Sequence, residues 1–348
     1  MGKEADWKKR NPNNIGGQAV IEGVMMRGKN TYAMAVRNPE GGITIEKNEW
    51  SASKRKRIWS YPIFRGVMAF WDSSVKGTKI LMRSAEIAGD DWADEELSPF
   101  EKYLQEKLGD KINDVLIYFS VFLSLVLGVS LFFILPVWLG NFFKTIVPTW
   151  ALGVIEGLIR IGIFLAYIIL ISRMKEIKRV FEYHGAEHKT INCLESGDEL
   201  SVENVMKHSR LHKRCGTSFL VFVMLISMIV FFFVRTDVIW LRFVTRIILI
   251  PVIAGLSFEI IRWAGNSENK LVGAISYPGF CMQKITTSEP DAGQVETAIA
   301  ALKGVLEEEN AGVKSVLKED SAEVKDILEN ENTEPEEVLE NGHTESVG

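Results

Sequence analysis

Long apolar runs alternate with charged segments along this chain. Residues 115–139 and 217–234 contain no charged side chain, and each run is long enough to cross about 30 Å of hydrocarbon as a helix. Residues 150–171 and 238–264 are also strongly apolar but carry a few charges. We therefore predict an α-helical multi-pass membrane protein with about four transmembrane helices in these segments. The alternative is two spans, with the two charged segments lying flat on the membrane.

The chain before the first apolar run shows shorter patterns. Residues 15–50 alternate partly between apolar and polar positions, and Asn-Pro-Glu-Gly-Gly at 38–42 is a strong turn signal. This predicts a small β-rich cytoplasmic region. After Pro62, apolar residues recur at helical spacing, namely Phe64, Val67, Met68, Trp71 and Val75. Together with the basic cluster at 54–57, they predict an amphipathic helix on an anionic membrane face; the alternative is packing against the strands.

These patterns divide the chain into five parts. They are an N-terminal tail (1–14), a β-rich cytoplasmic region (15–60), amphipathic or juxtamembrane helices (61–113), a membrane domain (114–302) and a disordered acidic tail (303–348). The membrane domain includes a histidine-rich cytoplasmic loop at 172–216, between the second and third spans, and a C-terminal motif at 276–302.

The composition fits this division and excludes several classes of protein. The chain is 47% hydrophobic and 24% charged, which requires apolar and charged residues to be segregated. The tail holds four basic and fourteen acidic side chains, so it carries a net charge of −10 and the rest of the chain +5. Such a tail is typical of disorder. Three cysteines without paired spacing favour a reducing compartment. We exclude an ordinary soluble enzyme, a secreted disulfide scaffold and a nucleic-acid-binding domain.

The distribution of basic residues predicts the orientation. Residues 172–216 contain nine Lys and Arg side chains, whereas the short loops on the opposite face contain Lys144 and Arg235. The positive-inside rule therefore places this loop and both termini in the cytoplasm. Arg242 and Arg246, early in the last span, either snorkel outwards or pair with Glu156 inside the bundle.

Four of the five histidines lie in the cytoplasmic loop: His184, His188, His208 and His212. His184 and His188 are four residues apart, so on a helix both imidazoles share one face and can bind one metal ion, with Glu187 beside them. This H-x-x-E-H order occurs in inverzincin proteases, where the Glu is the general base. His212 and Cys215 add a nitrogen and a sulfur ligand, and this donor set favours zinc over magnesium or calcium.

The alternative is a set of polar interfacial histidines that hydrogen-bond lipid phosphate or the backbone. Gly185, inside the motif, favours this alternative because glycine weakens a helix by about 1 kcal/mol relative to alanine. A bound metal would also not by itself mean catalysis, since a closed four-ligand site is structural.

Four sequence blocks resemble one known family. They are residues 16–28 (GGQAVIEGVMMRG), 183–189 (YHGAEHK), 211–219 (LHKRCGTSF) and 277–294, from Tyr-Pro-Gly through Gln283 and Glu289-Pro290 to Gln294. In these blocks the chain is similar to the YqhQ-like family (DUF1385), bacterial membrane proteins catalogued as a domain of unknown function, for which metal-dependent enzyme activity has been suggested. The resemblance covers residues 15–302. It implies the same membrane fold in the bacterial cytoplasmic membrane.

The first of these blocks has two interpretations. Its glycines favour close backbone approach in a hairpin, in which Glu22 and Arg27 form a buried ion pair. In the functional interpretation, Gln18, Glu22 and Arg27 face the histidine cluster and Arg27 binds a phosphate or carboxylate, with His208 as a further candidate contact. Residues 286–288 are predicted to cap a helix that extends to residue 302, and a substrate contact there is the alternative.

Three functions fit these observations. The first is a metal-dependent hydrolase at the cytoplasmic membrane face, with zinc as cofactor and a lipid head group, a nucleotide-like phosphate or a membrane-protein segment as substrate. The second is a non-enzymatic membrane scaffold or assembly factor with a structural metal site and a membrane-protein partner. The third is a transporter, which charged residues within the spans favour but the lack of an internal sequence repeat opposes.

Cysteine labelling tests the orientation. A cysteine at Asn141 or Thr236 should react with a membrane-impermeant thiol reagent added to intact cells, whereas a cysteine at Ser196 should react only after permeabilisation. The wild-type chain is the control for the native cysteines. Labelling of intact cells at position 196 alone would invert the orientation.

Overall fold

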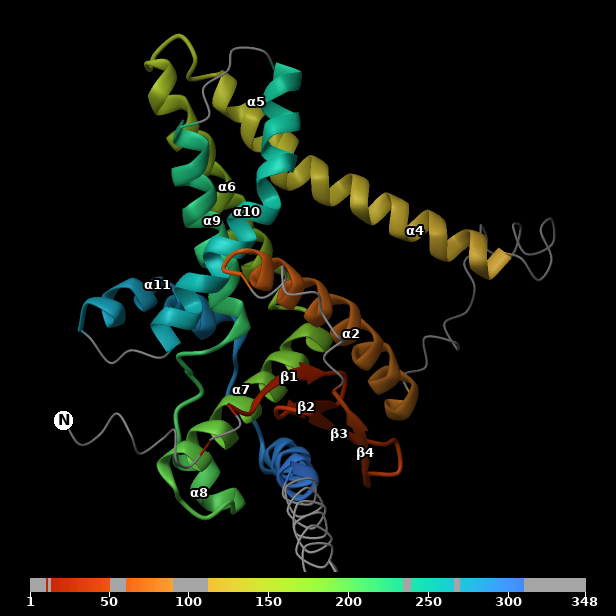
Figure 1. The fold of residues 1–348 in the computed structure, drawn as a ribbon. Coiled ribbons are helices and arrows are strands. Elements are labelled where there is room, and N and C mark those ends of the chain that lie inside the picture. Colours follow the sequence, from red (N-terminus) through yellow and green to blue (C-terminus); the bar gives the residue numbers. More distant parts are fainter. Residues whose placement is uncertain are drawn as a thin grey trace, which may run out of the picture. The chain divides into compact units, whose positions relative to one another are not determined.

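The computed structural model describes residues 11, 14–50, 61–89, 112–233, 239–265 and 270–309 (Figure 1). The chain divides into two compact units, residues 1–305 and 306–348, and only residues 306–309 of the second are described. The basic cluster at 54–57 and the acidic tail beyond residue 309 lie outside the described residues.

Most of the described chain is helical. The helices are α2 (Phe64–Ala88), α4 (Ile112–Val129), the π-helix η3 (Ser130–Ile134), α5 (Leu135–Asn141), α6 (Thr149–Ile171), α7 (Lys175–Ser196), α8 (Val202–Lys207), α9 (Gly216–Phe233), α10 (Ile239–Gly265) and α11 (Lys270–Thr286). A further helix extends from 292 to 309.

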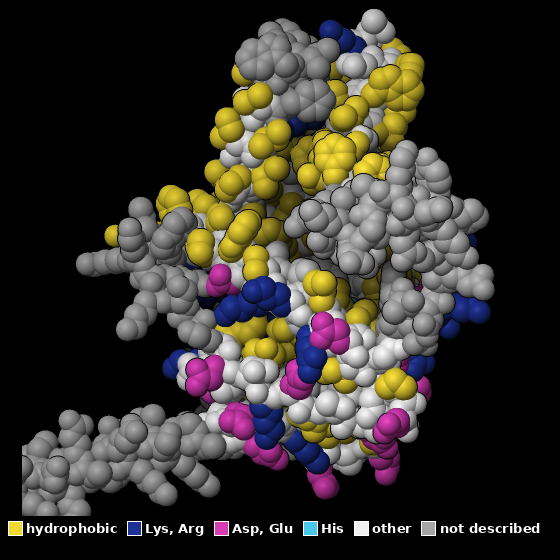
Figure 2. Space-filling model, turned by 90° about the vertical axis from the view of Figure 1, so that its right-hand side faces the viewer, with side chains coloured by type: hydrophobic (Ala, Val, Ile, Leu, Met, Phe, Trp, Pro, Cys, Tyr) yellow, Lys and Arg dark blue, Asp and Glu magenta, His cyan; other side chains and the backbone are white. Residues whose placement is uncertain are grey.

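Four helical segments are long and apolar enough to cross a membrane. They are Phe122–Asn141, Ala151–Ile171, Gly216–Phe233 and Val244–Trp263, and their positions match the four predicted segments. The two segments with internal charges belong to the bundle, since α6 and α10 both pack against α9. Exposed hydrophobic side chains cover the part of the molecule that holds α5, α6, α9 and α10, whereas charged side chains gather around the sheet (Figure 2).

Small residues let these helices approach closely. A Cβ at Gly157 in α6 would lie 2.6 Å from Met228 in α9, and one at Gly66 in α2 would lie 2.8 Å from Phe258 in α10. Such contacts are typical of helix interfaces in membranes. Arg65 adds an ion pair at the second interface, where its Nε and Nη2 donate to Glu259 at 2.6 and 2.5 Å.

The predicted β-rich region is a four-stranded antiparallel sheet in the order β1–β2–β3–β4. The strands are β1 (Gly16–Val20), β2 (Gly23–Arg27), β3 (Thr31–Arg37) and β4 (Ile43–Glu49). The predicted turn connects β3 and β4. In it, Asn38 Oδ1 accepts from Gly42 N at 2.7 Å, and Gly41 adopts a φ of 85°, which glycine tolerates best.

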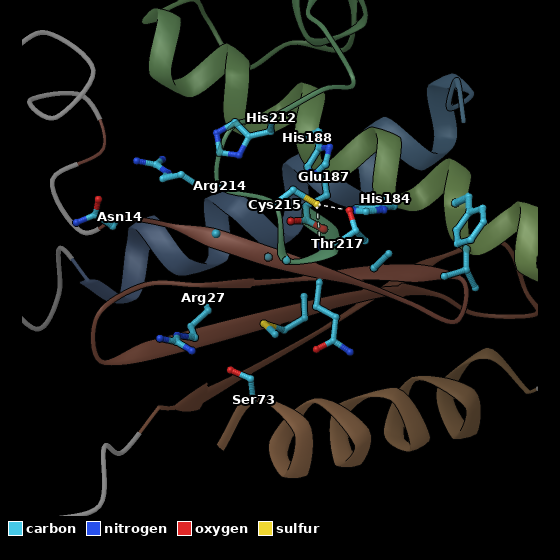
Figure 3. A pocket seen from close by; sticks show the side chains of 18 of the residues that line it. Asn14, Arg27, Ser73, His184, Glu187, His188, His212, Arg214, Cys215 and Thr217 are labelled. Carbon is cyan, nitrogen blue, oxygen red and sulfur yellow. Dashed lines mark hydrogen bonds between the residues drawn. The ribbon is translucent and has the colours of Figure 1, made fainter. Parts of the chain in front are cut away.

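Both faces of the sheet are covered, which explains why its strands do not alternate cleanly. On one face, Met34 and Val36 pack with Ile80 of α2. On the other face, β1 and β2 contact α7, and Ala33 lies against Gly304 of the helix at 292–309. Figure 3 shows the sheet between α7 and α2. Because both faces are buried, the central part of β3 is a continuous buried run.

The helix α2 has two apolar faces. The helix does pack against the strands, but through Ile80 and not through the predicted apolar row, so that alternative is wrong for the row itself. The opposite face exposes Phe64, Trp71, Val75 and Met82, which recur at helical spacing. The membrane-surface interpretation of this second face stays a prediction.

Three local features differ from the sequence analysis. The segment 172–216 is largely helical, because α7 and α8 occupy most of it. The helix at 292–309 begins after Asp291 and not after 286–288, since Asp291 Oδ1 accepts from Gln294 N at 2.8 Å and Gln294 Oε1 accepts from Asp291 N at 2.9 Å, which is a capping box. Residues 270–286 form α11 although Pro278 lies inside it.

Candidate functional site

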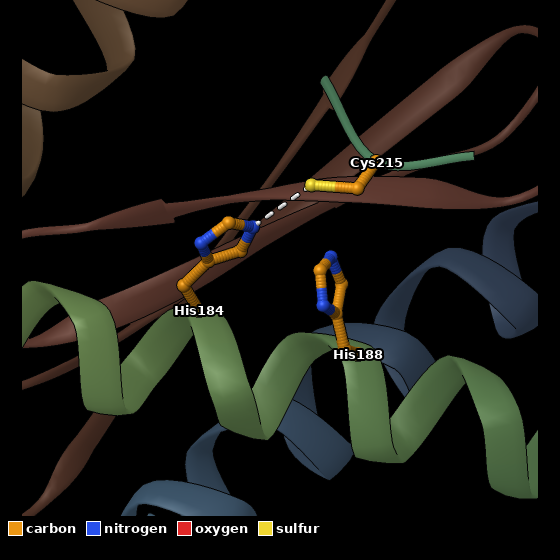
Figure 4. Close-up of side chains that lie close together, drawn as sticks. All are labelled: His184, His188 and Cys215. Carbon is orange, nitrogen blue, oxygen red and sulfur yellow. Dashed lines mark hydrogen bonds between the residues drawn. The ribbon is translucent and has the colours of Figure 1, made fainter. Parts of the chain in front are cut away.

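Three potential metal ligands from distant parts of the chain meet beside the sheet (Figure 4). His184 and His188 lie on one face of α7, and Cys215 immediately precedes α9. One ligand atom from each lies within 4.8 Å of the other two, and Cys215 Sγ is 3.3 Å from His184 Nε2. A sulfur and a nitrogen bound to one tetrahedral zinc ion lie about 3.5 Å apart. The cluster therefore has the donor types of a zinc site and nearly its spacing.

Backbone hydrogen bonds orient both imidazoles. Nδ1 of His184 lies 2.8 Å from the carbonyl oxygen of Thr286, and Nδ1 of His188 lies 2.6 Å from that of Arg210. Because a carbonyl oxygen only accepts, each Nδ1 carries the proton and each Nε2 has a lone pair. Burial also lowers the pKa of His188, which favours the neutral, metal-binding form. A carbonyl acceptor on the second ring nitrogen is the usual partner of a metal-binding histidine.

The sulfur of Cys215 receives hydrogen bonds from the first turn of α9. Thr217 N donates to Sγ at 3.3 Å, and Thr217 Oγ1 lies 3.0 Å from Sγ. Cys215 itself is buried. The start of a helix carries partial positive charge, so this position suits a sulfur that is negatively charged, as a metal ligand is.

Buried polar side chains hold the segment between α8 and α9, which carries Cys215. Lys189 on α7 is only 5% exposed, and its Nζ donates to the carbonyl oxygens of Met206, in the last turn of α8, and of His208, just after α8, at 3.0 and 2.9 Å. Gln283 on α11 accepts from the backbone N of His212 and donates to its carbonyl oxygen, both at 2.9 Å. Lys189 was counted in the sequence analysis among the positive charges of residues 172–216. In the structure its ammonium group lies inside the protein and donates hydrogen bonds to backbone carbonyl groups, which need donors when they are buried.

Gly185 permits a close contact and does not interrupt α7. A Cβ at this position would lie 2.0 Å from the carbonyl oxygen of Ser288, and Ser288 N donates to Phe181 O at 2.8 Å. The contact brings the chain after α11 against α7, where the carbonyl of Thr286 meets His184. Because α7 is continuous through Gly185, both histidines lie on the same helix face.

Glu187 lies between the two histidines in sequence but faces β1. Its carboxylate accepts hydrogen bonds from the backbone N–H groups of Gly17 and Ala19, and a Cβ at Gly17 would lie 2.9 Å from Glu187 Cδ. Burial raises the pKa of Glu187 to about 7, although His184 and the two backbone groups act in the opposite direction. A carboxyl group with this pKa can accept or release a proton near neutrality.

A cavity of about 540 Å³ lies along β1, with His184, His188 and Cys215 on the α7 side of the sheet and Arg27 and Ser73 on the α2 side (Figure 3). Its lining includes the three potential ligands and Glu187, together with Gln18, Arg27, Trp50 and Arg214. Arg27 Cζ and Lys76 Nζ each lie 4.4 Å from the ring centroid of Trp50. This positive charge therefore borders the cavity on the α2 side of the sheet, across the strands from the potential ligands (Figure 3).

The two other histidines of the predicted cluster are placed differently. The ring centroid of His212 is 5.7 Å from that of His188, but its Nε2 lies 3.5 Å from Glu195 Oε2, and it is outside the group of three. Burial alone would raise the pKa of Glu195, but contacts with His212 and other neighbours lower it, so this carboxylate stays charged. His208 lies apart, with its Nε2 2.9 Å from Asp198 Oδ2.

The polar residues of the first sequence block are also separated. Gln18 and Arg27 line the cavity from the α2 side of the sheet, where Gln18 Nε2 donates to Gly77 O at 3.4 Å. The prediction that they face the histidine cluster is therefore wrong, because the sheet lies between them and α7 (Figure 3). Glu22, in the turn between β1 and β2, instead accepts from Arg179 Nη2 at 2.6 Å and from Tyr183 Oη at 3.3 Å. The predicted buried pair of Glu22 with Arg27 is therefore wrong. Glu22 connects the sheet to α7, on which both of its partners lie.

Two residues that shape the site were not predicted. Trp50 follows β4 and stacks against Arg27, and no pattern in the sequence indicates this contact. Glu195 pairs with Arg214 and contacts His212. It lies eleven residues after His184 on α7, which is three helical turns on the same face, and this spacing was the available signal.

The fold and site define a helical protein with four potential membrane spans, a β-sheet that is covered on both faces, and a His/Cys cluster beside that sheet. Residues 61–308 match the model of a family described as "protein of unknown function (DUF1385)". The chain is also 39% identical, over 315 residues, to YqhQ of Bacillus subtilis (strain 168), which is described as uncharacterized; the alignment covers 87% of this chain and 95% of that protein. No solved structure matches. The chain therefore belongs to the DUF1385 family, as the sequence blocks predicted.

Substitution of Gly185 tests the close contact between α7 and the chain after α11. In Gly185→Ala the new Cβ would collide with the Ser288 carbonyl, so we expect a loss of about 1–3 kcal/mol of stability, seen as a lower melting temperature of the detergent-purified protein. The matched control is Gly162→Ala in α6, where a Cβ meets nothing within 4 Å, and it should not lower the melting temperature. Equal melting temperatures for the two variants would contradict the contact.

Proposed function

We propose that this protein is a metal-dependent membrane enzyme, a hydrolase, that binds one zinc ion through His184, His188 and Cys215 at the cytoplasmic membrane face. The orientation of the imidazoles carries the proposal. Both Nδ1 atoms donate to backbone carbonyl oxygens, so both Nε2 atoms keep their lone pairs beside a buried sulfur. Polar interfacial histidines would not need this shared arrangement.

The donor set supports zinc as the ion. Two imidazole nitrogens and one thiolate suit zinc better than magnesium or calcium, which prefer oxygen. Three protein ligands leave one position of a tetrahedral ion for water, as in catalytic zinc sites. When bound, the ion would supply the Lewis acidity that activates such a water at neutral pH.

The residues around the cluster support hydrolysis. Glu187 is the candidate general base, because its pKa is raised to about 7 and it lines the same cavity as the ligands. Arg27 lines the same cavity from the α2 side of the sheet and suits an anionic group of a substrate that extends beyond the cluster. A lipid head group, a nucleotide-like phosphate or an acidic segment of a membrane protein has this chemistry.

A second function, a membrane scaffold or assembly factor with a structural metal, is favoured by the contacts of Glu187. Its carboxylate already accepts two backbone hydrogen bonds from β1, which is a structural use of this side chain. A metal ion between α7 and Cys215 would join further parts of the chain. In this function the cavity would bind a segment of a partner membrane protein.

Metal content tests the ligand set. Protein purified without chelator should contain one zinc ion per chain by elemental analysis, and His184→Ala, His188→Ala and Cys215→Ala should each reduce this at least tenfold. Because zinc needs neutral imidazole, its binding should weaken as the pH falls below about 6.5, the ordinary pKa of histidine.

Two further histidine variants complete the metal experiment. His208→Ala is the matched control and should keep its zinc, because His208 faces Asp198. His212→Ala should also keep it if three residues bind the ion, whereas loss would make His212 a fourth ligand and the site a closed, structural one. Wild-type protein that binds no zinc would refute the metal site and both functions built on it.

Glu187→Gln separates the enzyme from the scaffold. The amide can still accept hydrogen bonds but cannot take a proton, so we expect zinc to stay and hydrolysis to fall about 10²–10⁴-fold. The assay uses zinc-loaded protein in liposomes with a panel of phosphodiester and ester substrates, and the exposed Asp198→Asn is the control. Zinc-loaded wild-type protein that hydrolyses none of them, or a fully active variant, would favour the scaffold.

A further inference from the structure

A second cluster of charged side chains is buried between the potential membrane spans. It consists of Glu156 and Arg160 on α6 and Arg246 on α10, which are 1%, 8% and 4% exposed. Arg246 Nη2 pairs with Glu156, so pairing inside the bundle, one of the two predicted arrangements of Arg246, is confirmed. The helix α5 adjoins the cluster, since a Cβ at Gly140 would lie 2.6 Å from Glu156 Cγ.

Both guanidinium groups of the cluster lie near one aromatic ring. Arg160 Cζ is 5.4 Å and Arg246 Cζ is 5.0 Å from the ring centroid of Phe231 on α9. Arg160 Nε also donates to the carbonyl oxygen of Phe132 at 3.0 Å. Phe132 belongs to the π-helix η3, where the altered hydrogen-bond ladder leaves carbonyl groups for other partners. Both cations therefore lie against the same side chain of α9.

The cluster has more donors and more positive charge than its described surroundings balance. Among the residues that the structure describes, no acceptor reaches Arg160 Nη2 or Arg246 Nη1, and both atoms are buried. Two arginines and one glutamate also give the three residues a net charge of +1. An unbalanced charge away from water is costly. An anion would supply both the acceptors and the negative charge.

We propose that Arg160 and Arg246 bind a singly charged oxyanion in this cluster. Planar guanidinium groups suit oxyanions because their N–H groups pair with two oxygens at once. Glu156 and Arg246 each lie seven residues after the first residue of their helix. At 1.5 Å per residue, this places them about 10 Å from the N-terminus of α6 and of α10. The ligand at this depth is the phosphodiester of a lipid head group or a free phosphate ion.

This anion site is separate from the proposed metal centre. Arg160 lies eleven residues before the end of α6, or about 16 Å along the helix, and α7 with its histidines follows beyond that end. The anion site therefore does not depend on the proposed function, and either proposal can fail without the other.

The stability of the full-length protein in different anions tests the proposal. Lipid-depleted protein in a neutral detergent is titrated with inorganic phosphate at pH 6, where this ion is mainly singly charged, with bulky gluconate keeping the ionic strength constant. A second series adds phosphatidylglycerol or phosphatidylcholine to the micelles. We expect phosphate or phosphatidylglycerol to raise the melting temperature of the wild type by about 5 °C at saturation. A response to phosphate identifies a free ion as ligand, and a response to phosphatidylglycerol alone identifies a lipid.

Charge-changing variants distinguish a binding site from a purely structural cluster. Arg160→Gln leaves the neutral pair of Glu156 and Arg246, so it should be more stable than the wild type in gluconate and should lose the response to anions. Glu156→Gln adds unbalanced charge, so it should be less stable in gluconate and respond more strongly. Arg173→Gln, at an exposed arginine just beyond α6, is the matched control and should respond as the wild type does.

Two results would overturn the anion site. One is a wild-type melting temperature that neither phosphate nor either lipid changes, and this result needs no variant to fold. The other is an Arg160→Gln protein that responds as strongly as the wild type, which would place the anion elsewhere. A purely structural cluster predicts that Arg160→Gln is less stable than the wild type in every buffer.

Discussion

The polar side chains buried on α7 must find hydrogen-bond partners, and the arrangement of the site follows from this requirement. A buried polar group without a partner costs more than the typical hydrogen bond contributes. Glu187 takes its partners from the backbone of β1, Lys189 from the end of α8 and the residue after it, and the half-buried His184 from the end of α11. Three segments far apart in the sequence are thereby fixed around one helix, and Cys215 is brought to the two imidazoles.

The His/Cys cluster and the Glu/Arg cluster differ in what they lack. Around the histidines, backbone carbonyl groups occupy both Nδ1 atoms and leave lone pairs that suit a cation. Between α6 and α10, two guanidinium nitrogens have no acceptor among the described residues, which suits an anion. The first cluster lies beside the sheet and the second between the apolar helices. The two proposed sites thus have opposite preferences.

Local patterns predicted the parts of the fold that depend on local physics. Hydropathy indicated the four apolar helices because the transfer of a helix into hydrocarbon depends on its own side chains. The four-residue spacing placed His184 and His188 on one face, as α7 has them. The N-cap of the helix at 292–309 was misplaced because the hydroxyls of Thr286 and Thr287 bond back to the preceding turn of α11. The cap at Asp291 was equally consistent with the sequence.

The sequence by itself determined the four long apolar helices, the strands and the pair of histidines, since each follows from residues within a few positions of one another. Only the tertiary structure decided that Cys215 completes the group of three, that Glu22 pairs with Arg179 across 157 residues, and that Gly185 is needed for a contact with Ser288. It also placed Arg160 and Arg246 near the same ring of Phe231. The physical reason is that each of these contacts joins segments that are far apart in the sequence. Whether such segments meet depends on the packing and backbone hydrogen bonds of the whole unit, and the spacing of nearby residues does not encode it.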